Sequence, residues 1–231
     1  MKIFNSLCVI AAVYFAWCIA RQRLFKHAWF IWAIGLAAPH VFLSQSSGLT
    51  EPLFAFLLVL SAYFYLKNRI SISLVIFSFL PFVRSEGWVL GVVLIVLLLV
   101  EKHWKKLPLI FSGSVIYGLL GAIFYKDFLW FINENPYSGV SEYYGSGDGW
   151  HFFKQMPYLF GWPFTGMMAI GIIVSLYYLL RRTKKLEAYH WWIYGMGLAM
   201  IVSHSIFWSQ GWFKSYGMQR VLIAVFPLYA L

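Results

Sequence analysis

The chain has 231 residues, of which 61% are hydrophobic and 11% are charged, and its formal net charge is +10. A soluble core cannot bury so large an apolar fraction, so the composition excludes an ordinary soluble domain and indicates an integral membrane protein. Most of the basic residues lie in four short loops between apolar stretches. The positive charge therefore follows the positive-inside bias of membrane proteins and does not indicate a nucleic-acid partner.

Nine apolar runs predict an all-α fold, a polytopic transmembrane bundle of about nine helices. The runs occupy residues 3–20, 28–43, 50–66, 70–83, 86–100, 107–125, 161–180, 189–208 and 218–231. The shorter runs reach only about 21 to 24 Å as helices, less than the ~30 Å hydrocarbon core. We therefore expect several short half-spans whose outer ends lie below the outer membrane surface. Residues 1–231 form one transmembrane domain in this interpretation.

Alternation of nine spans places all four basic loops on one side, which we assign as cytoplasmic. The loops carry Arg21, Arg23 and Lys26; Lys67 and Arg69; Lys102, Lys105 and Lys106; and Arg181, Arg182, Lys184 and Lys185. The main alternative fuses residues 70–100 into one helix kinked at Pro81. That alternative reverses the sidedness of every later loop, and the charge bias argues against it.

The opposite face carries six of the eight carboxylates, namely Glu51, Glu86, Asp127, Glu134, Glu142 and Asp148. It also holds the one long connection, residues 126–160, which is rich in glycine and aromatic residues. Long connections in compact proteins are often functional. We predict an extracytoplasmic loop there.

A polar interruption at residues 48–54 holds the first candidate site residue, Glu51. In a structural interpretation, Thr50 caps a helix, Pro52 suits its first turn, and Glu51 complements the positive end of the helix dipole. In a functional interpretation, Glu51 accepts hydrogen bonds from sugar hydroxyls or acts as an acid-base group. The two interpretations are compatible, because ionisable groups at membrane depth are costly and are usually retained for a function.

A second interruption, residues 83–87, holds Arg84 and Glu86. These two residues either neutralise each other at a helix break, where Gly87 permits a tight turn, or serve a ligand. The planar guanidinium of Arg84 suits the recognition of a phosphate at the outer lipid boundary.

Aromatic residues of the long connection have two possible roles. Tyr143, Tyr144, Trp150 and His151 either anchor the loop at the membrane interface or, with carboxylates such as Asp148 nearby, bind carbohydrate faces. The six histidines show no metal-ligand spacing, and no nucleotide-binding or serine-nucleophile motif is present. We expect neither a metal nor a cofactor.

Several motifs in this order resemble the GT-C class of polytopic glycosyltransferases and, more loosely, its mannosyltransferase branch related to the enzyme that adds the second mannose of GPI anchors. The strongest match covers residues 39–91 and rests on Pro39-His40, Ser46-Ser47-Gly48-Leu49-Thr50-Glu51-Pro52-Leu53-Phe54 and Arg84-Ser85-Glu86-Gly87. Weaker similarity covers the Tyr- and Gly-rich loop through Gly161-Trp162-Pro163, and Gln219-Arg220 followed by Pro227.

The resemblance implies transfer of a sugar, such as mannose, from a polyprenyl-phosphate donor to a glycan, lipid or protein acceptor on the extracytoplasmic or lumenal side. It implies that Arg84 or Arg220 binds the donor phosphate. Family members transfer the sugar with inversion of its anomeric configuration, and a carboxylate activates the acceptor hydroxyl. Here Glu51 and Glu86 are the candidates for that carboxylate. The expected location is the plasma membrane of a bacterium or the endoplasmic reticulum of a eukaryote.

One departure from the family concerns its catalytic acid, which usually lies in the first external loop, whereas this chain has no carboxylate before Glu51. We therefore expect a fragment that lacks a helix and the catalytic loop, or a complete chain that is inactive as an enzyme. Two other classes stay open: a transporter or flippase for a lipid or glycolipid, and a non-catalytic membrane assembly subunit. Polar breaks toward one face and the absence of repeats argue against a transporter.

Overall fold

The computed structural model describes residues 2–24, 27–32, 49–134, 145–181, 187–212 and 217–231. Every regular element within these ranges is helical, so the predicted all-α fold is confirmed. The elements are α1 (Lys2–Leu24), α4 (Glu51–Leu66), α5 (Ile70–Phe77), α6 (Leu80–Val83), α7 (Glu86–Val100), η1 (Trp104–Phe111), α8 (Ser112–Phe124), α9 (Trp130–Asn133), α10 (His151–Phe160), α11 (Trp162–Leu180), α12 (Ala188–His190), η3 (Trp191–Gly195), α13 (Met196–Gln210), η4 (Gln219–Val225) and α14 (Phe226–Tyr229).

Two helical stretches, Lys2–Gln22 and Trp104–Phe124, are long and apolar enough to cross a membrane by themselves. Shorter apolar helices occupy Glu51–Leu66, Ile70–Val83, Glu86–Val100, Trp162–Val174 and Gln219–Tyr229. Their positions agree with the apolar runs of the sequence, whereas most of the run 28–43 lies outside the described residues. The nine-span topology stays a prediction.

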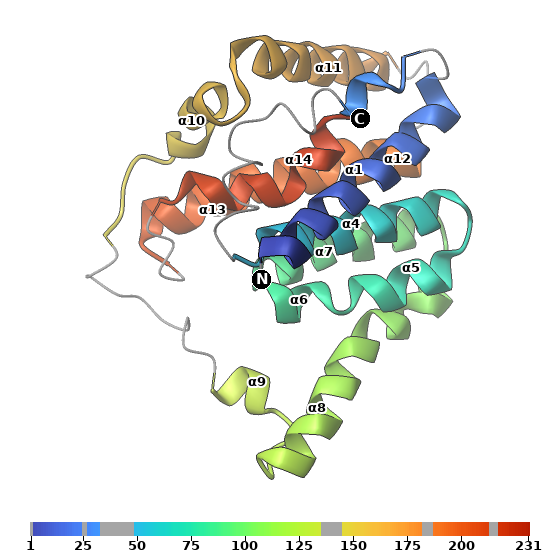
Figure 1. The fold of residues 1–231 in the computed structure, drawn as a ribbon, viewed down its shortest axis with the longest axis vertical. Helices are drawn as coiled ribbons and strands as arrows, with labels where there is room; N and C mark the ends of the chain where they lie inside the picture. The colour runs from blue at the N-terminus through green and yellow to red at the C-terminus, as the bar shows by residue number, and fades with distance from the viewer. Residues whose placement is uncertain (1, 25–26, 33–48, 135–144, 182–186, 213–216) are drawn as a thin grey trace.

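The helices of residues 70–100 form a hairpin and not one kinked helix. The chain leaves the helical conformation at Arg84, whose φ of −154° and ψ of 141° are extended. After this break, α7 runs back in the direction opposite to α5 (Figure 1). A Cβ atom on Gly87 would lie 2.4 Å from the backbone nitrogen of Pro81, so glycine is needed because α6 and α7 approach closely.

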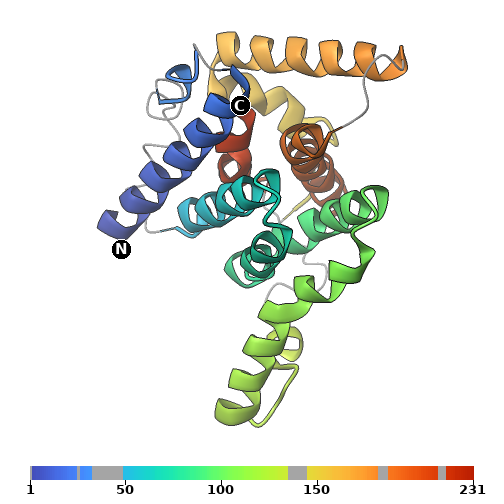
Figure 2. The same ribbon diagram turned by 90° about the vertical axis from the view of Figure 1, so that its right-hand side faces the viewer.

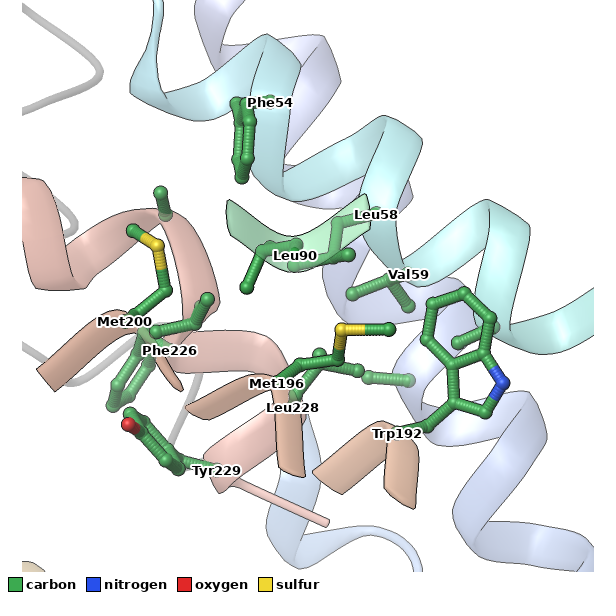
Figure 3. Packing of buried hydrophobic residues seen from close by; sticks show 14 of the residues in the cluster. Phe54, Leu58, Val59, Leu90, Trp192, Met196, Met200, Phe226, Leu228 and Tyr229 are labelled. Atoms are coloured by element: carbon green, nitrogen blue, oxygen red, sulfur yellow. The ribbon is translucent and has the colours of Figure 1, made fainter. Parts of the chain in front are cut away.

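The core lies where α4, α7, α13 and α14 meet (Figure 3). Phe54 and Leu58 of α4 are fully buried there, facing Leu90 of α7 and Met196 and Met200 of α13. Helix α4 contacts α1 on one side and α5 and η4 on others, which makes it the central helix of the bundle. Its first residue is consequently surrounded by protein.

The two ends of the bundle differ in charge. Helices α1, α4, α7 and α11 all end on the right-hand side of Figure 1, whereas α4 and α7 begin, and α13 ends, on the left. The described residues of the four basic loops therefore gather at one end, and the two polar interruptions lie at the other. Helix α8 projects away from the bundle together with α9 (Figure 2).

Candidate functional site

Two helices begin with a carboxylate at the same end of the bundle. Glu51 is the first residue of α4, and Glu86 is the first residue of α7. The positive end of each helix dipole stabilises the negative charge there. Thr50 occupies the N-cap position and Pro52 lies in the first turn, as expected, but the Thr50 side chain makes no capping hydrogen bond.

Arg84 lies between the two carboxylates and joins them. Its Nη1 is 2.8 Å from Oε1 of Glu51, and its Nη2 is 2.7 Å from Oε1 of Glu86. The Nε–H of Arg84 also donates to Oε1 of Glu86 at 3.2 Å. Because Arg84 follows α6, these contacts connect the start of α4 to the α6–α7 turn.

These groups are buried to different degrees. The Glu51 side chain has no exposed surface, the Glu86 side chain is 8% exposed, and the Arg84 side chain is 17% exposed. Neither Glu51 oxygen has a hydrogen bond of good geometry within the described part of the chain, so its charge is compensated by ion pairs alone. Removing one partner of such a pair leaves an uncompensated buried charge, which typically costs about 3–5 kcal/mol.

His204 of α13 completes the group on the α7 side. Its Nε2 lies 3.5 Å from Oε1 of Glu86, and the ring is buried against Phe152 of α10 at a centroid distance of 5.5 Å. Sequence reasoning missed this contact, because the histidines were examined only for metal-ligand spacing. The signal was nevertheless present, since His204 is an ionisable group within an apolar run that we predicted to span the membrane, residues 189–208.

Arg220 is the second arginine that approaches Glu51. Its Nε is 3.5 Å from Oε1 of Glu51, and its side chain is 44% exposed. Arg220 is the second residue of η4, which packs against α4. One carboxylate oxygen thus faces two arginines, of which one is buried and the other is open to the surroundings.

Five elements surround this group, because α4 contacts η4, η4 contacts α10, α10 contacts α13 and α13 contacts α7. We call the side chains of Glu51, Arg84, Glu86, His204 and Arg220 the charged cluster. Its two arginines balance its two carboxylates when the imidazole is neutral. At its border, the amide N–H of Gln219 donates to Oε1 of Gln155 at 2.6 Å.

The predicted residues of the long connection are not part of the charged cluster. Tyr143 and Tyr144 lie outside the described residues. Asp148 pairs with Lys154 at the exposed start of α10, where the hydrogen bond from Lys154 lowers the pKa of Asp148. His151 contacts the carbonyl oxygen of Gly217 through Nε2 at 2.9 Å. Helix α10 begins within this connection, although we predicted a loop through residue 160.

Within the described ranges, no three His, Cys, Asp or Glu side chains gather closely enough to hold a metal ion. The expected absence of a metal stays a prediction. No family model, curated protein or solved structure matches this chain.

Proposed function

We propose that this chain belongs to a membrane glycosyltransferase that moves a sugar, such as mannose, from a polyprenyl-phosphate donor to an acceptor on the extracytoplasmic or lumenal face. The observation that carries the proposal is the half-exposed side chain of Arg220, whose guanidinium pairs with the fully buried carboxylate of Glu51. A fixed cation at one end of an apolar bundle suits the phosphate of a lipid that arrives through the bilayer.

The two arginines have different roles in this proposal. Arg84 directs Nε, Nη1 and Nη2 toward Glu51 and Glu86, so its charge is already matched twice. Arg220 contacts Glu51 through Nε at 3.5 Å, and its two terminal nitrogens have no ion-pair partner within the described residues, so we assign them to an anion. We therefore assign the donor phosphate to Arg220, and we assign to Arg84 the task of fixing Glu51.

The carboxylates act as supports of the arginines. Glu51 is fully buried and pairs with both Arg84 and Arg220. Glu86 pairs with Arg84 and also contacts His204. A general base has to reach the acceptor hydroxyl within hydrogen-bonding distance. Their burial therefore favours Glu51 and Glu86 as positioning residues over their role as catalytic bases.

The proposed sidedness rests on the charge distribution. The basic loop residues that the structure describes lie at one end of the bundle, and the charged cluster lies at the other. Under the positive-inside rule the basic end is cytoplasmic, so the cluster faces the other side. The two long apolar helices support a membrane location. The remaining short helices serve as the half-spans of the proposed nine-span topology.

The proposal is tested by photocrosslinking a polyprenyl-phosphate hexose to the purified protein in lipid nanodiscs, together with radiolabelled sugar transfer in membranes that contain it. We expect Arg220→Ala to weaken donor binding by at least about tenfold, because a charge-assisted contact is lost. Arg220→Lys should restore part of the affinity. Arg69→Ala, which removes an exposed arginine at the basic end, is the matched control.

Equal donor binding by wild type and Arg220→Ala would refute the phosphate assignment. A second function, that of a non-catalytic assembly subunit, is favoured by the internal charge balance of the cluster. In that case neither arginine variant changes donor binding, and Arg84→Ala instead releases the partner proteins that purify with the chain. A donor that binds normally and crosses the bilayer without sugar transfer would indicate the transporter class.

A further inference from the structure

An amide pair joins two helical elements at the border of the charged cluster. Gln219 directly precedes Arg220 in η4, and its amide N–H donates to Oε1 of Gln155 on α10. Both side chains are half-buried, so they lie at the border between the protein interior and the surroundings. The pair is therefore partly accessible, and one of its members is the chain neighbour of Arg220.

The bond between the two amides uses only part of their hydrogen-bonding capacity. A glutamine side chain has one carbonyl oxygen and two N–H donors. The contact at 2.6 Å employs one N–H of Gln219 and the oxygen of Gln155. The amide nitrogen of Gln155 and the amide oxygen of Gln219 take no part in it, so the pair offers a donor and an acceptor from two elements that fix each other.

We propose that Gln155 and Gln219 form the subsite for the sugar hydroxyls of a lipid-phosphate sugar whose phosphate is bound by Arg220. This inference rests on the proposed function. Neighbouring hydroxyls of a sugar ring each donate and accept, which matches a fixed donor beside a fixed acceptor. The phosphate attached to such a ring would bind Arg220, the chain neighbour of Gln219. The subsite thus distinguishes a glycosylated lipid phosphate from the bare one.

The test compares the affinity of the protein in nanodiscs for two lipids, polyprenyl phosphate and polyprenyl-phosphate hexose. In wild type we expect the hexose-bearing lipid to bind more tightly. The double variant Gln155→Met/Gln219→Met should lose about five- to tenfold for this lipid alone, because two neutral hydrogen bonds disappear. The affinity for polyprenyl phosphate should be unchanged. Gln210→Met, at the exposed end of α13, is the matched control.

A second variant separates ligand binding from a structural tie. Gln155→Glu keeps an oxygen that accepts from Gln219, but it removes the amide N–H that we assign to the sugar. We expect normal thermal stability and weaker binding of the hexose-bearing lipid. If both lipids weaken equally in the double variant, or neither changes, the sugar subsite is refuted. If wild type binds neither lipid, the proposed function itself fails.

Discussion

Charged side chains are exposed at one end of the bundle and largely buried at the other. At one end, Lys67, Arg69 and Lys102 are exposed, and the carboxylate of Glu101 is held by the hydroxyl of Tyr65. At the other end, Glu51 and Arg84 are paired, with Glu51 fully buried and the Arg84 side chain only 17% exposed. Charge count thus distinguishes the two ends of the bundle, whereas burial and pairing identify the charged cluster at one of them.

The largest change in stability is expected for a variant at the buried end. Arg84→Met leaves Glu51 and Glu86 without their shared cation, so we expect the free energy of unfolding in detergent micelles to fall by about 3–5 kcal/mol. Arg69→Met at the exposed end should change it little. Adding Glu51→Gln and Glu86→Gln to Arg84→Met should recover much of the loss. A loss below about 1 kcal/mol in the single variant would show that the cluster is solvated.

The next effect concerns the turn that places Arg84. In Gly87→Ala, the new methyl group meets the backbone of Pro81 at 2.4 Å, and backbone atoms cannot move aside as a flexible side chain can. We expect a loss of about 1–3 kcal/mol in unfolding free energy. Gly149→Ala is the control, because its nearest contact is Cβ of Ser209 at 3.8 Å. Equal stability of the two variants would contradict the close packing of α6 on α7.

A smaller effect is expected at the basic end. The Tyr65 hydroxyl donates to Oε2 of Glu101 at 2.6 Å, and this contact connects α4 to the end of α7. Tyr65→Phe removes the bond and should reduce the unfolding free energy by about 1 kcal/mol, because Glu101 is partly solvated. Tyr158→Phe, which alters an exposed tyrosine, should have no effect. A loss of unfolding free energy as large as that of Arg84→Met would contradict the expected difference between the two ends.

The smallest effect concerns the exposed pair of Asp148 and Lys154. Lys154→Ala should raise the pKa of Asp148 toward its ordinary value, as measured by NMR of the labelled carboxyl carbon. Because the folded pKa is lowered, the pair stabilises the protein above the unfolded pKa of Asp148, and this contribution disappears as pH falls through the folded pKa. Solvent screens this exposed pair, so the midpoint of unfolding at neutral pH should stay the same. A clear drop in this midpoint would mean that the exposed pair stabilises the fold much as the charged cluster does.

Local signals in the sequence predicted much of the fold. The run 86–100 coincides with α7, and the run 50–66 differs from α4 by one residue, because apolar stretches bounded by polar residues define helices directly. The approach of Arg84 to Glu51 follows from the same reasoning. Two helices that begin at the same end of a bundle bring their first residues together.

Other contacts depend on packing between distant parts of the chain and carry no local signal. Arg220 meets Glu51 only because η4 packs on α4, and His204 meets Glu86 only because α13 packs on α7. Helix α10 was not expected, because its first residues follow a glycine-rich stretch and Pro157 lies inside it. The sequence therefore indicated which residues are unusual, but not all of their neighbours.

The order in which the charged cluster assembles follows from its distribution along the chain. Synthesis delivers Glu51, Arg84 and Glu86 to the membrane within one short segment, long before Arg220 emerges. That early trio carries one excess negative charge, and only the arrival of η4 removes it. Since N-terminal segments are made first, η4 acts as a late neutralising step for this trio in biogenesis. A ribosome that stalls before residue 220 would leave an incompletely neutralised intermediate, a natural substrate for membrane quality control.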